Sequence, residues 1–152
     1  MLSAARDALE EVRSVVSDLH GGEEIDLRSV LGALAEKIPR VRLHLSLPDQ
    51  LSMTDAARAN SVLRCVQEIT TNTLKHSDAA NLWIVLRING DAIEIEARDD
   101  GRNSRRSEAG FGLKTMRQRF EELGGTVSFD SSNDHGFMVR ALLPSTGIGE
   151  GK

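Results

Sequence analysis

Apolar residues recur at helical spacing near the start of the chain. In residues 2–19 the intervals between them are 3, 4, 3, 4 and 3, which makes a heptad seam of two and a half repeats. The seam consists of Leu2, Ala5, Leu9, Val12, Val16 and Leu19. It fits a helix that covers its own domain, and it fits equally well the remnant of a helical dimerisation bundle. The Gly21-Gly22 pair ends this helix.

We expect three further helices, each with a polar or glycine signal at its boundary. They run from the candidate N-cap Asp26 to about Ile38, from Thr54 or Asp55 to about His76, and from Gly112 to Leu123. In the long middle helix the apolar stripe at intervals of 4, 3 and 4 predicts the face that packs on the core. This stripe consists of Val62, Val66, Ile69 and Thr73.

Alternating apolar and polar residues predict strands between and after these helices. The stretches are 41–47, 82–88, 92–98, 126–130 and 136–144. The Asn89-Gly90 pair is a strong hairpin signal, because both residue types adopt positive φ. The two predicted hairpins require antiparallel neighbours, which argues against a doubly wound parallel sheet. The sequence therefore predicts an α+β fold: a two-layer α/β sandwich with one mixed sheet of about five strands and helices on one face.

Composition narrows the class of protein. A chain of 152 residues that is 39% hydrophobic and 28% charged has the size of one compact domain. The single Cys65 excludes an internal disulfide, no apolar run reaches the length of about 18 residues that a membrane span needs, and residues 1–13 do not resemble a signal peptide. We therefore expect a cytoplasmic location. The tail, residues 145–152, is expected to be disordered.

The charge distribution favours a small anionic ligand. The net charge of −4 argues against a general nucleic-acid binder, which would carry a basic surface. Between residues 102 and 119, however, six basic residues stand against the single acidic Glu108, so this segment carries about +5.

The stretch QEITTNTLKHSDA, residues 67–79, places polar residues in the middle of the long helix. Glu68, Asn72 and His76 follow one another at i, i+4 and i+8, so their side chains point into the same space, with Lys75 beside them. Carboxylate and amide oxygens suit Mg²⁺, and cationic groups suit phosphate. Taken alone, the stretch is also explained as a solvated helix face.

Two later stretches add to this picture. The sequence DDGRN follows a predicted strand and delivers Asp99 to the rim of the sheet, where a carboxylate can accept a hydrogen bond from an exocyclic amine such as that of adenine. Gly110 and Gly112 flank Phe111 just before a helix, where free amides and the positive end of the helix dipole can bind phosphate.

In this order the three stretches resemble the N box, G1 box and G2 box of the GHKL ATPase superfamily, most closely the catalytic ATP-binding domain of sensor histidine kinases. Within these, the chain resembles the subfamily that pairs with LuxR/NarL-type response regulators. The similarity runs from about residue 2 to Pro144. It implies the Bergerat fold, with ATP and Mg²⁺ as ligands. It also implies three segments: a remnant of a second dimerisation helix in residues 1–20, the catalytic domain in residues 21–144 and the tail in residues 145–152.

The resemblance further implies a role for each matched position. Asn72 would ligate Mg²⁺, Glu68 would act as general base or orient the water of the ion, and Lys75 and His76 would contact phosphates. Asp99 would read the adenine amine, and Gly101 would let the base lie close. Gly110, Gly112 and Leu113 would shape the phosphate loop, and Arg105 and Arg106 of a short lid between Asn103 and Glu108 would lie near the triphosphate.

The sequence departs from the family pattern at two points. Asn103 stands where the G1 box usually has its last glycine; asparagine tolerates left-handed backbone well, so the substitution is mild but affects the lid. None of the four histidines, His20, His44, His76 and His135, lies in a phosphoacceptor motif. The implied reaction is therefore transfer of the γ-phosphoryl group of Mg-ATP to a histidine outside this segment, in a dimerisation domain. A serine kinase of the anti-sigma-factor type and a non-catalytic nucleotide-binding module are the alternatives.

Overall fold

The computed structural model of the chain describes residues 25–53, 55–90, 92–101, 111–132 and 136–144. The expected helix over residues 2–19 and the tail lie outside these ranges. Among the described helices, none is long and apolar enough to cross a membrane.

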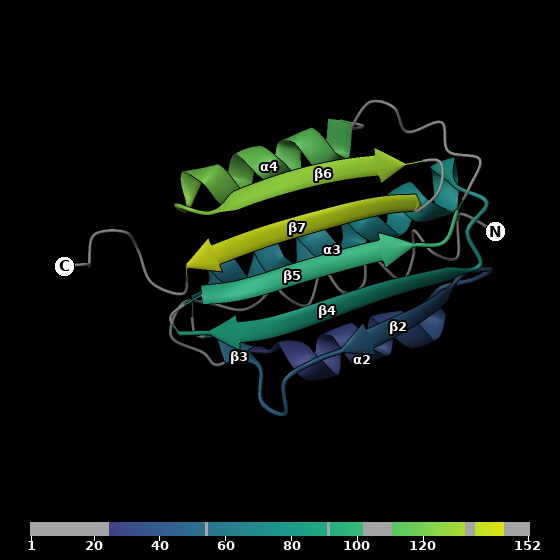
Figure 1. Cartoon of the computed structure of the whole chain (residues 1–152). Coiled ribbons are helices and arrows are strands. Elements are labelled where there is room, and N and C mark those ends of the chain that lie inside the picture. Colours follow the sequence, from purple (N-terminus) through teal and green to yellow (C-terminus); the bar gives the residue numbers. More distant parts are fainter. Residues whose placement is uncertain (1–24, 54, 91, 102–110, 133–135, 145–152) are drawn as a thin grey trace.

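One mixed sheet forms the centre of the fold (Figure 1). Its five strands are β2 (Arg42–Ser46), β4 (Asn81–Asn89), β5 (Ala92–Asp99), β6 (Thr126–Ser132) and β7 (Gly136–Pro144), in the order β2-β4-β5-β7-β6. β2 pairs with β4 in parallel, and the other neighbours are antiparallel. The prediction of a mixed sheet with two hairpins is confirmed. Two further strands, β1 (Ile25–Asp26) and β3 (Ser52–Met53), pair separately and were not predicted, because two residues are too few to show an alternation.

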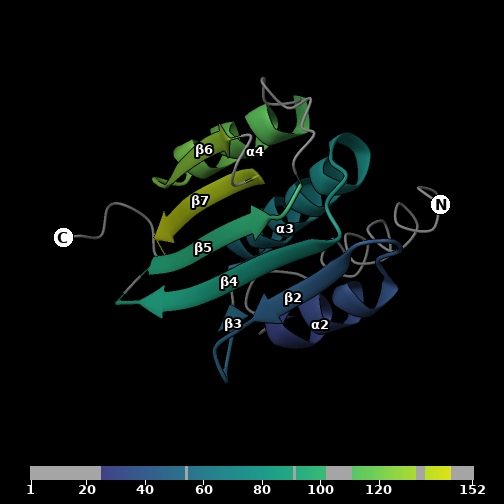
Figure 2. The same ribbon diagram turned by 45° about the vertical axis from the view of Figure 1, so that its right-hand side comes forward.

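Three helices, α2 (Leu27–Lys37), α3 (Ala56–His76) and α4 (Phe111–Glu122), lie on the same face of the sheet. Figure 2 shows them behind the strands from a second direction. The predicted two-layer α/β sandwich is confirmed, and each predicted helix boundary within the described residues agrees within one or two residues.

The core lies between these two layers. Ile84 of β4 and Ile95 of β5 face inward and are no more than 1% exposed, as are Val62, Val66 and Ile69 of α3. Burying such side chains stabilises a fold by about 1.5–3 kcal/mol each. The apolar stripe predicted for the long helix is therefore the face that packs on the sheet.

Polar contacts fix the start of α3. The Asp55 carboxylate caps the helix by accepting hydrogen bonds from the amides of Ala57 and Arg58, at 3.0 and 3.2 Å. Arg58 Nη1 pairs with Asp55 Oδ2 at 2.6 Å, while Arg58 Nε donates to the carbonyl of Pro144 at the end of β7. The first turn of α3 is thereby attached to the sheet.

The turn between β4 and β5 differs from the prediction. Asn89 pairs with Ala92, so Asn89 is still part of β4 and the turn begins at Gly90. Gly90 has the positive φ, of 62°. The turn is therefore shifted by one residue, because the ladder continues far enough to pair Asn89.

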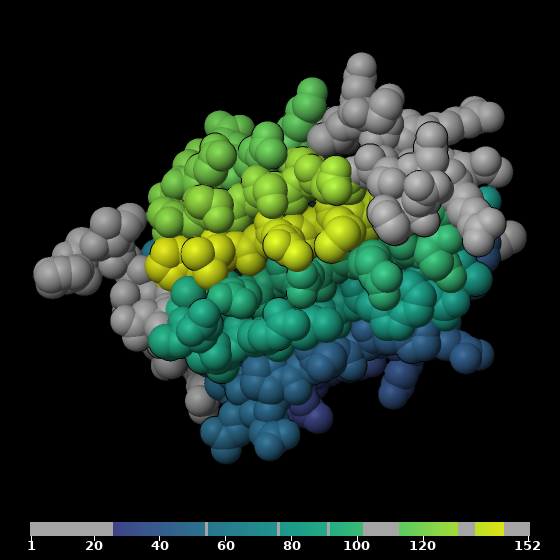
Figure 3. Space-filling view, viewed as in Figure 1, coloured from purple at the N-terminus to yellow at the C-terminus, as the bar shows by residue number. Residues whose placement is uncertain are grey.

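The other face of the sheet carries no helix among the described residues (Figure 1), and Figure 3 looks onto this open face. Side chains on this open face contact one another across neighbouring strands. His44 stacks on Trp83 with ring centroids 5.4 Å apart, and the Arg98 guanidinium lies 4.9 Å from the centroid of Trp83. Such cross-strand pairs stabilise a sheet.

Candidate functional site

The polar residues of α3 lie at different depths. Asn72 is buried, at 7% exposure, whereas Glu68 one turn earlier is half-buried and Lys75 is exposed. Nδ2 of Asn72 is buried without any hydrogen-bond partner, and it is the one such side-chain atom in the described part of the chain. A buried amide nitrogen without an acceptor costs about 1–3 kcal/mol. Such an atom is explained when a ligand supplies the acceptor.

The Asp99 carboxylate at the end of β5 accepts three hydrogen bonds. Its Oδ1 accepts hydrogen bonds from the amides of Gly101, at 3.0 Å, and Phe137, at 3.2 Å. Its Oδ2 accepts from the hydroxyl of Thr73 at 3.1 Å. Asp99 is the last residue of β5, at the end of the strand where the sequence indicated it, and it is only 1% exposed. It is buried because β7 pairs with β5 and brings Phe137 over the end of the strand.

Gly101 lies against the segment that joins α3 to β4, residues 77–80, which we call the connector. A Cβ atom at Gly101 would collide with Oγ of Ser77 and would lie 3.2 Å from Oδ1 of Asp78. Only glycine allows this close approach without a shift. The structure thus brings the end of α3 and the end of β5 together through the connector.

Asp100 fastens the connector to β5. Its Oδ1 accepts hydrogen bonds from the amides of Ala80 and Asn81, at 2.9 and 3.0 Å, and its Oδ2 accepts from Asn81 Nδ2 at 3.0 Å. Burial by itself would raise the pKa of Asp100, but the hydrogen bonds from Asn81 and Ala80 outweigh it and lower the pKa.

Sequence reasoning missed three residues that support Asp99. Thr73 was assigned to the core stripe, which its burial confirms, but its hydroxyl also donates to Asp99. Phe137 contributes a backbone amide, for which the sequence carries no signal. Gly136 has a φ of 78°, and a Cβ there would meet the carbonyl and the carboxylate of Asp99. The glycine after a turn was the available signal, although it is also ordinary at a hairpin.

The structure describes only some of the remaining predicted site residues. Gly112 and Leu113 lie in the first turn of α4, and the Leu113 side chain is a core residue at 2% exposure. His76 is the last residue of α3, but its side chain lies outside the described residues, as do Asn103, Arg105, Arg106 and Gly110.

Cys65 does not offer a nucleophile. Burial of the thiol, and secondarily the Glu68 carboxylate, raise the pKa of Cys65 well above its ordinary value. The thiol is therefore protonated at neutral pH, and the reactive thiolate is absent.

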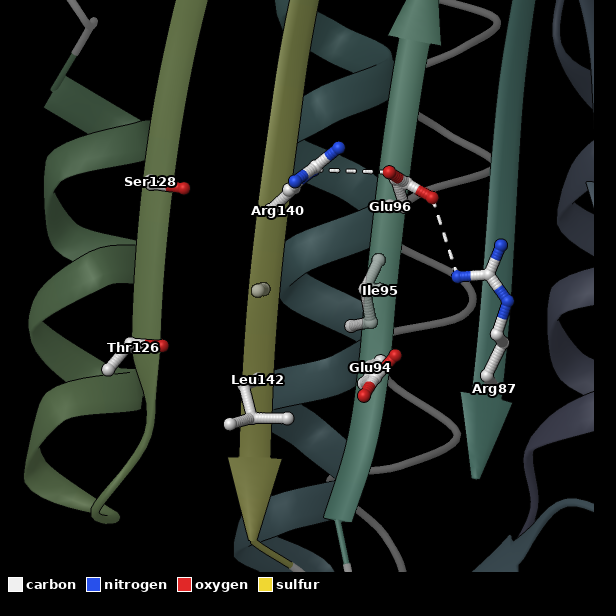
Figure 4. Close-up of a pocket in the computed structure, with 9 residues that line it drawn as sticks. Arg87, Glu94, Ile95, Glu96, Thr126, Ser128, Arg140 and Leu142 are labelled. Carbon is white, nitrogen blue, oxygen red and sulfur yellow. Dashed lines mark hydrogen bonds and ion pairs between the residues drawn. The ribbon is translucent and has the colours of Figure 1, made fainter. Parts of the chain in front are cut away.

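A hollow of ≈ 380 Å³ on the open face of the sheet is separate from these residues (Figure 4). Glu96 lies between two arginines there: Oε1 is 3.4 Å from Nη1 of Arg87, and Oε2 is 3.1 Å from Nε of Arg140. The charge of the Glu96 carboxylate is thus paired with two arginines of the same sheet. The hollow contains none of the predicted site residues.

The family pattern described as Histidine kinase-, DNA gyrase B-, and HSP90-like ATPase matches residues 57–147 of the chain. The sensor histidine kinases YxjM and LnrJ of Bacillus subtilis (strain 168) are 30% and 33% identical over 95% and 90% of this chain. The chain spans about a third of the length of these relatives, 36% and 35%. The blue-light activated histidine kinase of Erythrobacter litoralis EL346 has a similar fold, with a TM-score of 0.70 at 20% identity over 94% of this chain and 53% of that one.

Proposed function

Because the chain belongs to the family of histidine kinase-, DNA gyrase B- and HSP90-like ATPases, we propose that it is the part of a sensor histidine kinase that binds Mg-ATP and transfers its γ-phosphoryl group to a histidine. The acceptor histidine belongs to a dimerisation domain, of which residues 1–20 are a remnant. Residues 21–144 form the catalytic domain. The protein works in the cytoplasm with a LuxR/NarL-type response regulator as the next phosphoryl acceptor.

The observation that carries the proposal is the unpaired Nδ2 of Asn72. A carboxamide offers an oxygen to a hard cation and an N–H to a phosphate oxygen, so a magnesium phosphate complex satisfies both of its ends. No group of three His, Cys, Asp or Glu side chains in the described ranges could hold a metal ion by itself. A cation held by Asn72 would take its other ligands from water and the phosphates, as is usual for Mg²⁺.

Glu68 lies one turn before Asn72 on α3 and is half-buried, which supports a role for it beside this ion. We assign it the general base, or the group that orients a water of the ion. Lys75 and His76, at the end of the same helix, contact the phosphates. Bound magnesium neutralises charge on the phosphates, and the chain supplies positioning, which accounts for most of the catalysis in phosphoryl transfer.

Asp99 reads the base. The hydrogen bonds from Gly101, Phe137 and Thr73 hold its carboxylate in one orientation, and a carboxylate accepts the exocyclic amine of adenine but is repelled by the carbonyl oxygen that guanine has in its place. Gly101, next to it, leaves room for the ring. From the family resemblance we infer that Gly110, Gly112 and Leu113 would shape the phosphate loop, and that Arg105 and Arg106, between Asn103 and Glu108, would lie near the triphosphate.

Nucleotide titrations test the proposal. We expect ATP and ADP with Mg²⁺ to raise the melting temperature, GTP to have little effect, and ligand at 100 times its Kd to add about 2.7 kcal/mol of stability. The isolated chain should form no acid-labile phosphohistidine with labelled ATP until a dimerisation domain is added. Equal stabilisation by ATP and GTP would contradict the role of Asp99, and absence of any nucleotide effect would contradict the proposal as a whole.

A further inference from the structure

Arg40 has an unusual backbone conformation in the turn before β2. The amide of Val41 donates to the carbonyl of Pro39 across 2.6 Å, and Arg40 between them has a φ of 68°. Among the described residues it is the one non-glycine residue with positive φ. A three-residue turn of this kind is rare and strained. Such strain persists only where the surroundings hold the residue, and it concentrates at functional sites.

The Arg40 side chain binds the end of α3. Its Nη2 donates to the carbonyl of Leu74 at 2.9 Å and to that of Thr73 at 3.3 Å. These are among the last carbonyls of the helix, which have no partner inside it. The positive guanidinium also lies at the negative end of the helix dipole, where a cation is favoured.

The same guanidinium binds the connector. Nη2 donates to the carbonyl of Ser77 at 3.4 Å, and Nη1 donates to that of Ala79 at 3.2 Å. Arg40 thus binds carbonyls of the connector, whereas Asp100 binds the connector amide of Ala80. Gly101 packs against Ser77 of this segment. The planar fork of arginine presents its donors in one fixed geometry on two separate terminal nitrogens, whereas lysine has three rotatable donors on a single nitrogen.

We infer that Arg40 is a positioning residue of the nucleotide site. Its guanidinium holds the end of α3 and the connector in the relative position in which Asn72 and Gly101 can contact the same ligand. The inference rests on the proposed Mg-ATP site. Arg40 acts through the two segments and does not touch the nucleotide. The strained turn before β2 is the conformation that aims the side chain at these carbonyls.

Calorimetric titration of Mg-ATP into Arg40 variants tests this role. Arg40→Asn keeps a residue type that tolerates left-handed backbone but removes the guanidinium. We expect its affinity for Mg-ATP to fall about tenfold or more, and that of Arg40→Lys to fall less. Arg28→Asn is the matched control, because Arg28 Nη1 also binds two loop carbonyls, those of Leu47 and Pro48, at 3.3 and 2.8 Å, away from the connector. Its affinity should equal that of the unaltered chain.

Amide hydrogen exchange supplies a second readout. We expect faster exchange at Gly101 and Ala80 in Arg40→Asn, and no change there in Arg28→Asn. Unchanged Mg-ATP affinity in Arg40→Asn, or an equal loss in Arg28→Asn, would overturn the inference while the proposed function stands. If the unaltered chain itself does not bind Mg-ATP, the proposed function fails first. If Arg40→Asn does not fold, unchanged affinity in Arg40→Lys overturns the inference.

Discussion

The hydroxyl of Thr73 donates a hydrogen bond to Oδ2 of Asp99 across 3.1 Å, although 26 positions separate the two residues. Thr73 belongs to α3 and Asp99 to the end of β5, and both side chains are 1% exposed. The bond fixes the distance between the helix that carries Asn72 and the strand end that leads into Gly101. The cation-binding and base-binding halves of the proposed site are therefore tied together in the buried layer beneath it.

Replacing Thr73 by valine should remove the hydrogen bond to Asp99 while the volume of the side chain at position 73 stays nearly the same. We expect Thr73→Val to lose about 1–3 kcal/mol of unfolding free energy, because a buried carboxylate loses a donor, and to weaken ATP binding several-fold. Thr73→Ser keeps the hydroxyl and is the control, with ATP affinity close to that of the parent. Denaturant unfolding and calorimetric titration measure the two effects. Equal ATP affinity in the valine and serine variants would show that the hydrogen bond does not orient Asp99.

Asn72→Ala should separate ligand binding from stability. Nδ2 of Asn72 has no partner in the described structure, so its removal should leave the unfolding free energy of the ligand-free chain unchanged or slightly raised. Mg-dependent ATP binding should be lost. Asn60→Ala, near the other end of the same helix and about 18 Å away, is the control and should bind Mg-ATP normally. Wild-type affinity in Asn72→Ala would remove this residue from the metal site.

Three glycine substitutions should give three different results. In Gly101→Ala the new Cβ meets Oγ of Ser77, so we expect about 1–3 kcal/mol of destabilisation together with weaker ATP binding. In Gly125→Ala it meets the carbonyl of Leu142, far from the site, so stability should fall while ATP affinity is unchanged at temperatures where the variant is folded. Gly32 in α2 faces open space, and Gly32→Ala should raise stability by about 0.5–1 kcal/mol. Loss of ATP affinity in Gly125→Ala as well would mean that binding follows stability alone.

Asp100 should contribute a pH-dependent part of the stability. Its pKa in the folded chain lies below the ordinary value of 3.8, so the ionised carboxylate stabilises the fold above the unfolded-state pKa, and this contribution disappears as the pH falls through the folded-state pKa. The stability difference between the parent and Asp100→Asn should be largest above about pH 5 and should shrink below about pH 4. Urea unfolding between pH 3 and pH 7 measures it; a constant difference across this range would show that the charge of Asp100 does not matter.

Local sequence signals predicted most of the elements correctly. The 3.6-residue period of Val62, Val66 and Ile69 and the alternation in β4 and β5 report directly which side of each element avoids water. Asp26 was found as an N-cap, and Asp55 as one of two candidates beside Thr54, because capping involves residues only two or three positions apart. The hairpin turn was placed one residue too early because ladder pairing, not turn propensity alone, decides where a strand ends.

The sequence by itself determined the order of the three described helices and the five strands of the main sheet, the core face of α3 and, through three short motifs, the residues around which a nucleotide site is proposed. Only the tertiary structure decided that Asp99 is buried under the start of β7, that Thr73 serves the core and the site at once, and that Arg40 binds the end of α3. The reason is physical: periodicity and capping depend on neighbours along the chain, which the sequence displays. A hydrogen bond between two side chains 26 positions apart, or between a side chain and a backbone carbonyl 34 positions away, depends on how the layers pack, and no local pattern encodes that distance.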